Sequence, residues 1–230
     1  MNDVSHATTR ALVLRLMAKD VYLNRQTMFA ALIGGLASLI IASTSGIGYS
    51  IGSISFITTM MAFGVVLAMF SIAQERKDRS GMFVLSLPLA PMDYVRAKLL
   101  GTTLTYFIPW SVLSAGAVLV IPLTPLPDGA MPMTVLLLVY FLLTFSVMAL
   151  VALLVSSEAK TTLAIIATNM SLTFFMFGIS RIHGIGWGLD RKETPTWSGS
   201  FFAVLAAELA VIAITFAIPM CFNLRKKEFL

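Results

Sequence analysis

Six long apolar runs divide this 230-residue chain, and they constrain its fold more than any other feature of the sequence. At 1.5 Å of helix rise per residue, a run of about 20 apolar residues crosses a hydrocarbon core of about 30 Å. Only 12% of the residues are charged, which is about half the share found in soluble domains. We therefore predict an all-α integral membrane protein whose residues 27–230 form six transmembrane helices. The spans are expected at about 27–45, 51–73, 99–123, 132–155, 161–179 and 200–223.

Lys and Arg are distributed unevenly between the two sides of this topology. With the N-terminus in the cytoplasm, thirteen of the 16 Lys and Arg residues lie in cytoplasmic segments, against Arg181, Arg191 and Lys192 on the other side. Cytoplasmic loops of membrane proteins carry such an excess of basic residues. We therefore expect both termini to be cytoplasmic and residues 180–199 to form an extracytoplasmic loop. The net charge of +5 then follows from topology rather than from binding to nucleic acid.

The segment before the first span, residues 1–26, is expected to be a cytoplasmic tail with an amphipathic helix on the membrane surface. Val13, Met17 and Val21 recur at every fourth residue, with Arg15 and Lys19 on the opposite side. This spacing is typical of a helix that lies in the interface between lipid and water. The alternative is a solvated tail with a few apolar residues.

Residues 74–98, between the second and third spans, hold eight of the 27 charged residues. Here Ser80 can cap a short helix, Pro88 and Pro91 can end it, and Asp93 can cap the helix that leads into the third span. The stretch "GMFVLSL" gives this charged segment an apolar face that would be costly to leave in water. Either the bilayer surface or a partner protein is expected to cover that face.

The same segment resembles the cytoplasmic loop after the second helix of ABC-2 type transporter permeases. Those proteins carry the pattern E-R-x-x-G-T-L-x-x-L-L-x-L-P-V-S-x-x-x-Y-x-x-x-K. The residues that match it are Glu75, Arg76, Gly81, Leu85, Leu87, Pro88, Tyr94 and Lys98. The chain departs from the pattern at Met82, where Thr is usual, and at Ala90, where a small hydroxyl residue is usual.

The resemblance implies that this loop is a coupling helix seated in a groove of a separate ATP-hydrolysing subunit. An apolar centre with a charged rim is also the usual anatomy of a protein interface. The residues expected to contact the ATPase are Glu75, Arg76, Arg79, Gly81, Met82, Phe83, Leu85, Leu87 and Pro88. The alternative is a loop that merely lies on anionic lipid.

Motifs for catalysis are absent from the sequence. It contains no G-x-x-x-x-G-K-[ST] P-loop, no H-E-x-x-H and no G-x-S-x-G. We therefore expect a non-catalytic chain with no cofactor or metal of its own, and ATP with Mg²⁺ in the partner subunit. Cys221 is the single cysteine, which excludes an internal disulfide.

Glu208 is the only formal charge within the six predicted spans. A carboxylate at the bilayer centre costs about 2.5–3.5 kcal/mol on insertion scales and normally faces protein or a cavity. Its role is either a proton or cation relay or a carboxyl that is hydrogen-bonded inside the bundle.

The second and fifth spans are rich in Met and Phe, whose soft side chains suit varied apolar cargo. In the family that the loop resembles, these helices are expected to line the pathway. The candidate pathway residues are Met60, Phe63, Phe70, Asn169, Phe174, Phe177 and Glu208. The alternative for any one Met or Phe is ordinary contact with lipid.

Gly48 and Gly52 form a GxxxG pattern that indicates a close contact between helices.

The sequence as a whole predicts the permease subunit of an ATP-binding cassette exporter in a bacterial plasma (inner) membrane. It would pair with a second permease copy, as a homodimer or a heterodimer, and move an amphipathic peptide, antibiotic, lipid-like molecule or drug outward. Two alternatives remain. One is an ion-coupled transporter or channel without an ATPase, and the other is a structural or assembly membrane protein.

Overall fold

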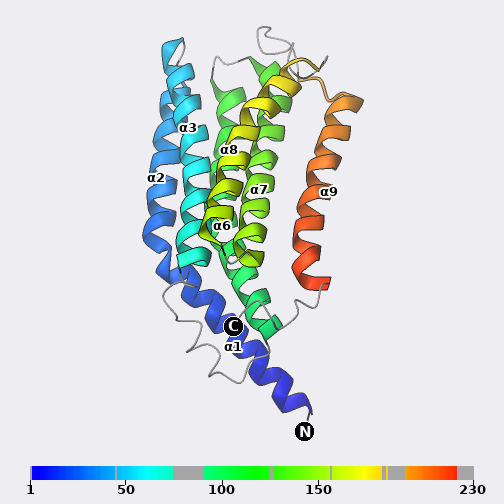
Figure 1. Ribbon diagram of the computed structural model, residues 1–230. Helices are drawn as coiled ribbons and strands as arrows, with labels where there is room; N and C mark the ends of the chain where they lie inside the picture. The colour runs from blue at the N-terminus through cyan, green and yellow to red at the C-terminus, as the bar shows by residue number, and fades with distance from the viewer. Residues whose placement is uncertain are drawn as a thin grey trace.

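The chain folds into a bundle of long, upright helices with one helix lying obliquely across one end (Figure 1). This computed structural model describes residues 2–44, 46–74, 91–124, 127–155, 157–182, 185 and 195–221, and side chains within 12–44, 46–71, 97–124, 127–155, 157–182, 185 and 195–219. The elements are α1 (Asn2–Leu23), α2 (Arg25–Ala42), α3 (Ile47–Val66), η1 (Leu67–Gln74), α6 (Pro91–Leu123), η2 (Asp128–Ala130), α7 (Met131–Leu154), α8 (Glu158–Ser180) and α9 (Gly199–Cys221).

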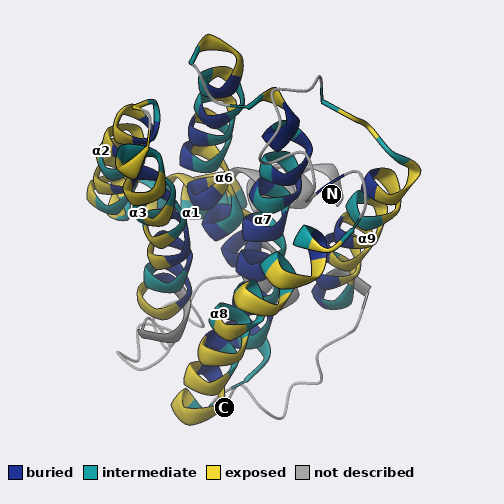
Figure 2. Ribbon diagram, turned by 90° about the horizontal axis from the view of Figure 1, so that it is seen from above, coloured by how far each residue is buried: buried dark blue, intermediate teal, exposed yellow. Residues whose placement is uncertain are grey.

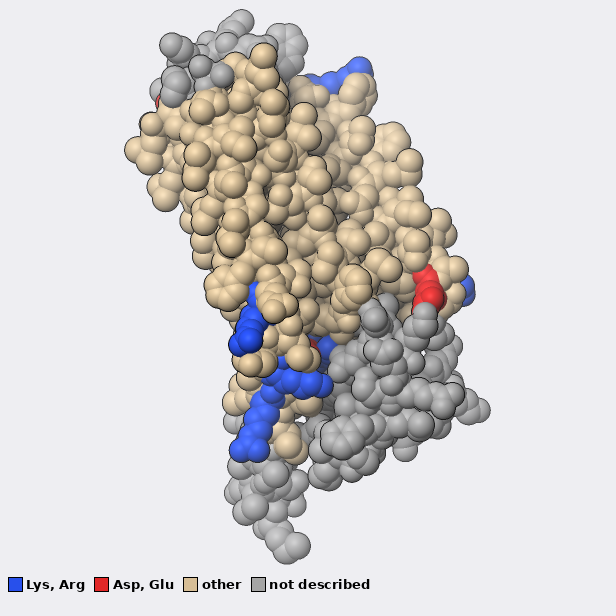
Figure 3. All heavy atoms as spheres, turned by 90° about the vertical axis from the view of Figure 1, so that its left-hand side faces the viewer, with Lys and Arg blue, Asp and Glu red and all other residues tan. Residues whose placement is uncertain are grey.

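Six helical segments of the described part of the chain are long and apolar enough to cross a membrane, as the sequence predicts. They are Arg25–Ala42, Ile47–Ser71, Ala97–Leu123, Asp128–Leu154, Glu158–Ser180 and Gly199–Pro219. The face of the molecule in Figure 3 shows a broad uncharged band, with Lys, Arg, Asp and Glu confined to its two ends. Such a band is what a bilayer requires of a surface that it covers.

The segment α7 lies at the centre of the bundle and α8 lies at its edge. In the most apolar stretch of the span formed by η2 and α7, 56% of the residues are buried, whereas 11% are buried in that of α8 (Figure 2). Contacts of α7 reach α3, η1, α6, α8 and α9, so this helix organises the others around it. The helix is mostly apolar, and its polar side chains are hydrogen-bonded, so it can be buried without leaving a polar side chain unsatisfied. These side chains are Thr134, Tyr140, Thr144 and Ser146.

Aromatic side chains from three helices form the middle of the main core. The ring of Tyr106 on α6 stacks between Phe63 on α3 and Phe145 on α7, with ring centroids 5.3 and 4.0 Å apart. The hydroxyl of Tyr106 donates a hydrogen bond to the carbonyl oxygen of Phe141 at 3.3 Å. Tyr106 can therefore be fully buried because its one polar atom has a partner.

Close contact between α2 and α3 confirms the prediction drawn from the glycine pair. A Cβ atom added at Gly52 would overlap the backbone of Ala42, and Gly48 lies against the side chain of Thr44. On the other side of α2, Gly35 leaves room for the side chain of Leu113 of α6. Small residues thus let α2 pack tightly against both of its neighbours.

The helix that contains the third span begins earlier in the chain than predicted. The helix α6 begins at Pro91 and continues without a break to Leu123. The prediction that Asp93 caps this helix is therefore wrong, since Asp93 lies inside its first turn. Proline is favoured at the first helical position because its ring fixes a helical φ and no N–H is needed there. Two prolines, Pro109 and Pro122, lie within α6.

Only Asn24 separates α1 from α2, so the chain bends directly from the oblique helix into the first span. Asn24 donates a side-chain hydrogen bond to the carbonyl oxygen of Asp20 at 2.8 Å. Val13, Met17 and Val21 are half-buried and Arg15 and Lys19 are exposed, while Leu14 is 64% exposed.

Candidate functional site

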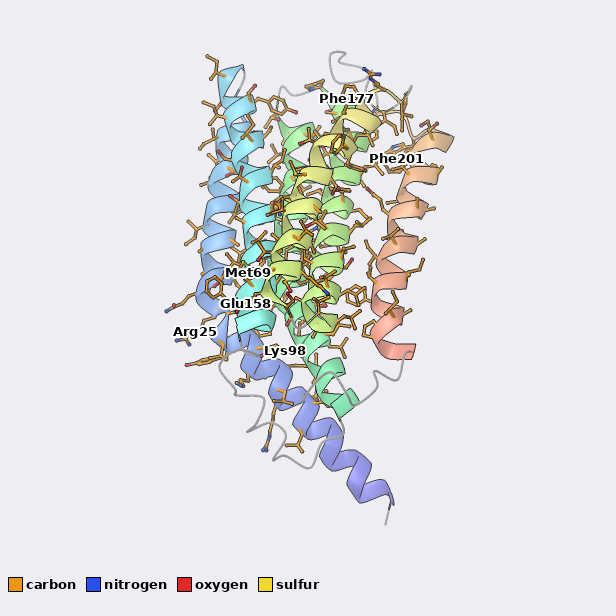
Figure 4. All side chains as sticks on the ribbon, in the orientation of Figure 1. Arg25, Met69, Lys98, Glu158, Phe177 and Phe201 are labelled. Carbon is orange, nitrogen blue, oxygen red and sulfur yellow. The ribbon has the colours of Figure 1, made fainter. Side chains whose placement is uncertain are left out.

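A buried ion pair joins α1 to the beginning of the third span. The Lys98 ammonium lies 3.1 Å from an Asp20 carboxylate oxygen, with side-chain exposures of 7% and 8%. Figure 4 shows Lys98 between α1 and the bundle, at the same end as Arg25 and Glu158. Lys98 lies in α6 and is the last residue of the predicted coupling segment 74–98, which α6 overlaps from Pro91. The charged pair therefore ties that end of α6 to α1.

The two helices approach closely at the same place. A Cβ atom added at Gly101 would lie 3.0 Å from an Asp20 carboxylate oxygen and 3.3 Å from the Cα atom of Met17. Gly101 follows Lys98 by three residues, so both lie on the face of α6 that contacts α1. The crossing of α1 and α6 thus combines a charged contact with close backbone packing.

The segment that precedes the predicted coupling loop is a π-helix, η1, which continues the second span. Its Ser71 hydroxyl lies 3.4 Å from the Thr102 hydroxyl of α6, and both residues are buried. Short π-helical stretches inside longer helices are frequent at functional sites. The helices before and after residues 75–90 are therefore in direct contact with each other.

The predicted coupling residues themselves lie outside the described residues. They are Glu75, Arg76, Arg79, Gly81, Met82, Phe83, Leu85, Leu87 and Pro88. Of the residues that match the loop pattern, only Lys98 has a described side chain. Their contact with an ATPase remains a prediction.

Two candidate pathway residues on α3 are part of the main core. Met60 is fully buried, and Phe63 is 3% exposed and stacks on Tyr106. Within this single chain both side chains fill space between α3, α6 and α7.

The candidates on η1 and α8 have a different environment. Phe70, Phe174 and Phe177 are 60%, 76% and 56% exposed, and the guanidinium of Arg181 lies 4.1 Å from the centre of the Phe177 ring. Asn169 is half-buried and donates a hydrogen bond to the carbonyl oxygen of Ile165 at 2.7 Å. The structure does not bring these residues together with Met60 and Phe63, so a pathway containing both sets remains a prediction.

Glu208 on α9 is 4% exposed, and neither of its carboxyl oxygens has a hydrogen-bond partner among the described residues. One of the two roles predicted for Glu208 is a carboxyl that is hydrogen-bonded inside the bundle. The described residues show no such hydrogen bond. Glu208 lies beside α7, where Tyr140 forms a hydrogen bond of 2.6 Å with Ser171 of α8. The sequence gives no signal for this Tyr140–Ser171 pair, or for Asp20 as the partner of Lys98. Both pairs join residues on different helices, far apart in the chain.

A cavity of about 150 Å³ lies between α2, α3, α6 and α7, in the half of the bundle remote from α1. Its walls are mainly apolar, and its polar groups include Tyr49, Ser53 and Thr134.

Among the described residues, no three His, Cys, Asp or Glu side chains are grouped so that they could hold a metal ion.

Comparison with known proteins agrees with the loop pattern and the six spans. A family model described as ABC-2 family transporter protein matches residues 37–190, about two thirds of the chain. No curated protein and no solved structure matches. The matched range contains four of the six spans, the end of the first span and the predicted coupling segment, and it confirms the family that the segment resembles. The chain therefore belongs to the ABC-2 transporter family and is a permease, the membrane subunit of an ABC transporter.

Proposed function

We propose that this permease couples ATP hydrolysis in a separate ATPase subunit to outward movement of an amphipathic substrate. The observation that carries the proposal is the way in which both ends of the segment 75–90 are anchored in the bundle. On one side η1 contacts α6 through Ser71 and Thr102, and on the other side Lys98 of α6 is paired with Asp20 of α1. A displacement of this segment would therefore reach α3, α6 and α1 together.

The apolar stretch of the segment is the proposed contact with the ATPase. Met82, Phe83 and Leu85 lie between Arg76 and Arg96 in the sequence, which suits a partner groove with an apolar floor and acidic edges. This placement also puts both termini and α1 on the cytoplasmic side, with α1 on the membrane surface.

The test is affinity purification of the tagged chain from its own membranes in mild detergent. We expect a stoichiometric partner with a P-loop motif, since the permease sequence has none. A double substitution, Phe83→Asp with Leu85→Asp, is expected to abolish that association and to leave membrane insertion unchanged. The matched control, Phe83→Leu with Leu85→Met, preserves an apolar surface and is expected to retain the partner. An intact complex without an ATPase would instead favour a channel or an assembly protein.

We also propose that α8 faces a second permease. This helix is the least buried span, yet Thr162 and Thr173 are exposed on it and Asn169 is half-buried. Polar side chains in membrane helices usually face protein or a water-filled cavity rather than lipid. A second copy placed against α8 would cover these groups and enclose a pathway next to Phe174 and Phe177.

Cross-linking tests this arrangement in a Cys221→Ser background. A cysteine at Thr173 is expected to give a disulfide-linked dimer upon oxidation, whereas one at Ile214, exposed on α9, is expected to remain monomeric. Disulfides require Cα atoms within about 7 Å, so only a residue close to the dimer axis reacts. A cross-link at Ile214 but not at Thr173 would contradict the arrangement. If the pairing is heterodimeric, a second permease co-purifies instead.

A further inference from the structure

Glu208 is a buried carboxyl for which the described residues supply no partner. Its exposure is 4%, and both oxygens lack a hydrogen bond within that part of the chain. An ionised carboxylate in a membrane span is costly unless a counter-charge or a hydrogen-bond donor meets it. Among the described residues, therefore, no hydrogen-bond donor meets this strong acceptor.

The level of Glu208 in the bundle follows from a hydrogen bond nearer the α1 end. Thr215 of α9 donates to Ser146 of α7 at 3.0 Å, and the two helices run in the same direction (Figure 1). Glu208 precedes Thr215 by seven residues, and Tyr140 precedes Ser146 by six. The carboxyl and Tyr140 are therefore at nearly the same height on two helices that pack against each other.

Three helices place polar and aromatic groups at this level. The Tyr140 hydroxyl of α7 bonds to the Ser171 hydroxyl of α8 at 2.6 Å, and each oxygen still has a free lone pair. The Tyr140 ring stacks on Phe175 with centroids 3.9 Å apart. A carboxylate with hydroxyl oxygens and aromatic rings at the same level is the chemistry that recognises an ammonium group.

The neighbouring surface toward the end remote from α1 is apolar. Leu205 and Val204 precede Glu208 by three and four residues, so they lie on the same face of α9. Like Phe175 and Met176 of α8, they are partly buried and pack against the same buried apolar cluster, which includes Leu136 and Phe201. Apolar material can therefore lie directly next to the carboxyl.

Cations of the described helices do not reach this position. Lys98 is paired with Asp20. On α8, Lys160 precedes Ser171 by eleven residues and Arg181 follows it by ten, which is about 15 Å or more along the axis. In the described part of the chain Glu208 does not belong to any group of three His, Cys, Asp or Glu side chains that could hold a metal ion.

We propose that Glu208, at the level of the Tyr140–Ser171 pair, binds the ammonium group of an amphipathic amine. The apolar part of that amine lies along Val204, Leu205 and Phe175. As a statement about transported cargo, this inference rests on the proposed function; as a statement about binding, it rests on the geometry around Glu208 alone.

The test compares two probes that differ in one charge. Dansylcadaverine carries a primary ammonium on an apolar fluorophore, and its N-acetyl derivative is neutral. Binding of each is measured by fluorescence to the full chain in phosphatidylcholine nanodiscs, with empty nanodiscs as background. We expect the chain to bind the amine at least about tenfold more tightly than the neutral probe, the factor that one charge-assisted hydrogen bond supplies.

The Glu208→Gln variant keeps the shape of the side chain and is expected to lose this preference. Glu158→Gln makes the same chemical change at an exposed carboxyl in the first turn of α8 and is expected to retain it. Should Glu208→Gln fail to fold, Glu208→Asp keeps the charge and is expected to keep the preference. Equal binding of the two probes by the unmodified chain, or an unchanged preference in Glu208→Gln, would overturn the proposal.

Co-purification of the ATPase with the same samples separates the two levels of inference. An ATPase-bound chain without amine preference overturns the amine site and leaves the proposed function intact. A chain that prefers the amine but has no ATPase supports the site and overturns the proposed function.

Discussion

The Asp20–Lys98 pair fixes where α1 lies on the bundle. An exposed ion pair contributes little to stability, but these side chains are only 7–8% exposed. Removing one partner of a buried pair leaves an uncompensated charge, which costs more than the pair itself contributes. The contact therefore selects one position of α1 against α6 and penalises others.

Single substitutions at this pair are expected to be more costly than the double substitution. Asp20→Asn or Lys98→Met should each lower the free energy of unfolding by about 3–5 kcal/mol, because a buried charge loses its partner. The double variant should lose less than the sum, and thermal unfolding of the purified protein in detergent measures all three. Arg15→Gln, at an exposed position on α1, is the control and should change little. Strictly additive losses would show that the two charges do not interact.

The sequence identifies residues of an unusual type for their position, but it does not predict which residues contact each other. Glu208 stands out because it is a charge in an apolar span, and its burial agrees with that prediction. The contact of Asp20 with Lys98 joins positions 78 residues apart and has no local pattern. Met60 and Phe63 illustrate the same limit, because apolar residues suit the core, the lipid face and a transport pathway equally.

Helix packing depends on glycine at a few points. Gly52 of α3 lies so close to α2 that no side chain fits between them, whereas Gly178 near the end of α8 has nothing within 4 Å of the place where a Cβ would be. Backbone atoms cannot move aside as a flexible side chain can. The two glycines therefore have different roles, although both lie within predicted spans.

The same substitution at these two glycines is expected to have different effects. Gly52→Ala should destabilise the bundle by about 1–3 kcal/mol, because its methyl group overlaps the backbone of Ala42. Gly178→Ala should be neutral or slightly stabilising, since alanine is the better helix former. Thermal unfolding of both variants, together with the amount of protein in the membrane, distinguishes them. Equal effects would mean that α2 and α3 do not pack at Gly52.

Length and composition suffice to predict the spans, but not their neighbours. A run of about 20 apolar residues must cross the bilayer whatever lies beside it. Lipid tails are as apolar as leucine, so the hydrophobic effect does not decide which helices touch. Apolar composition therefore predicts neither the central place of α7 nor the exposed position of α8.

The Lys and Arg residues whose side chains are described lie at the two ends of the molecule. Arg15 and Lys19 on α1, Arg25 at the start of α2 and Lys160 at the start of α8 lie at the end that α1 occupies, which Figure 4 shows for Arg25 and for Glu158 at the start of α8. Arg181 follows α8 at the other end. The excess of basic residues on one side is the signal that orients membrane proteins during insertion. The end that carries α1 is accordingly predicted to face the cytoplasm.

Cysteine accessibility tests this orientation in a Cys221→Ser background. A cysteine at Ser50, exposed at the end remote from α1, should react with a membrane-impermeant maleimide added to intact cells. One at Lys160, exposed near the α1 end, should react only after the membrane is permeabilised. The reverse pattern would invert the topology and remove α1 from the side where an ATPase meets the membrane.

Pro109 divides α6 into two parts that can move differently. Proline has no N–H, so the carbonyl oxygen of Thr105 has no intrahelical donor at that turn, and the helix is easier to bend there. The part before Pro109 carries Lys98 and Gly101, whereas the part after it packs against α2 through Leu113. We therefore expect α6 to bend at Pro109, so that the part tied to α1 changes its angle relative to the part packed against α2. A Pro109→Ala variant should keep its fold and its ATPase but stimulate hydrolysis less when cargo is added, and unchanged stimulation would locate the pivot elsewhere.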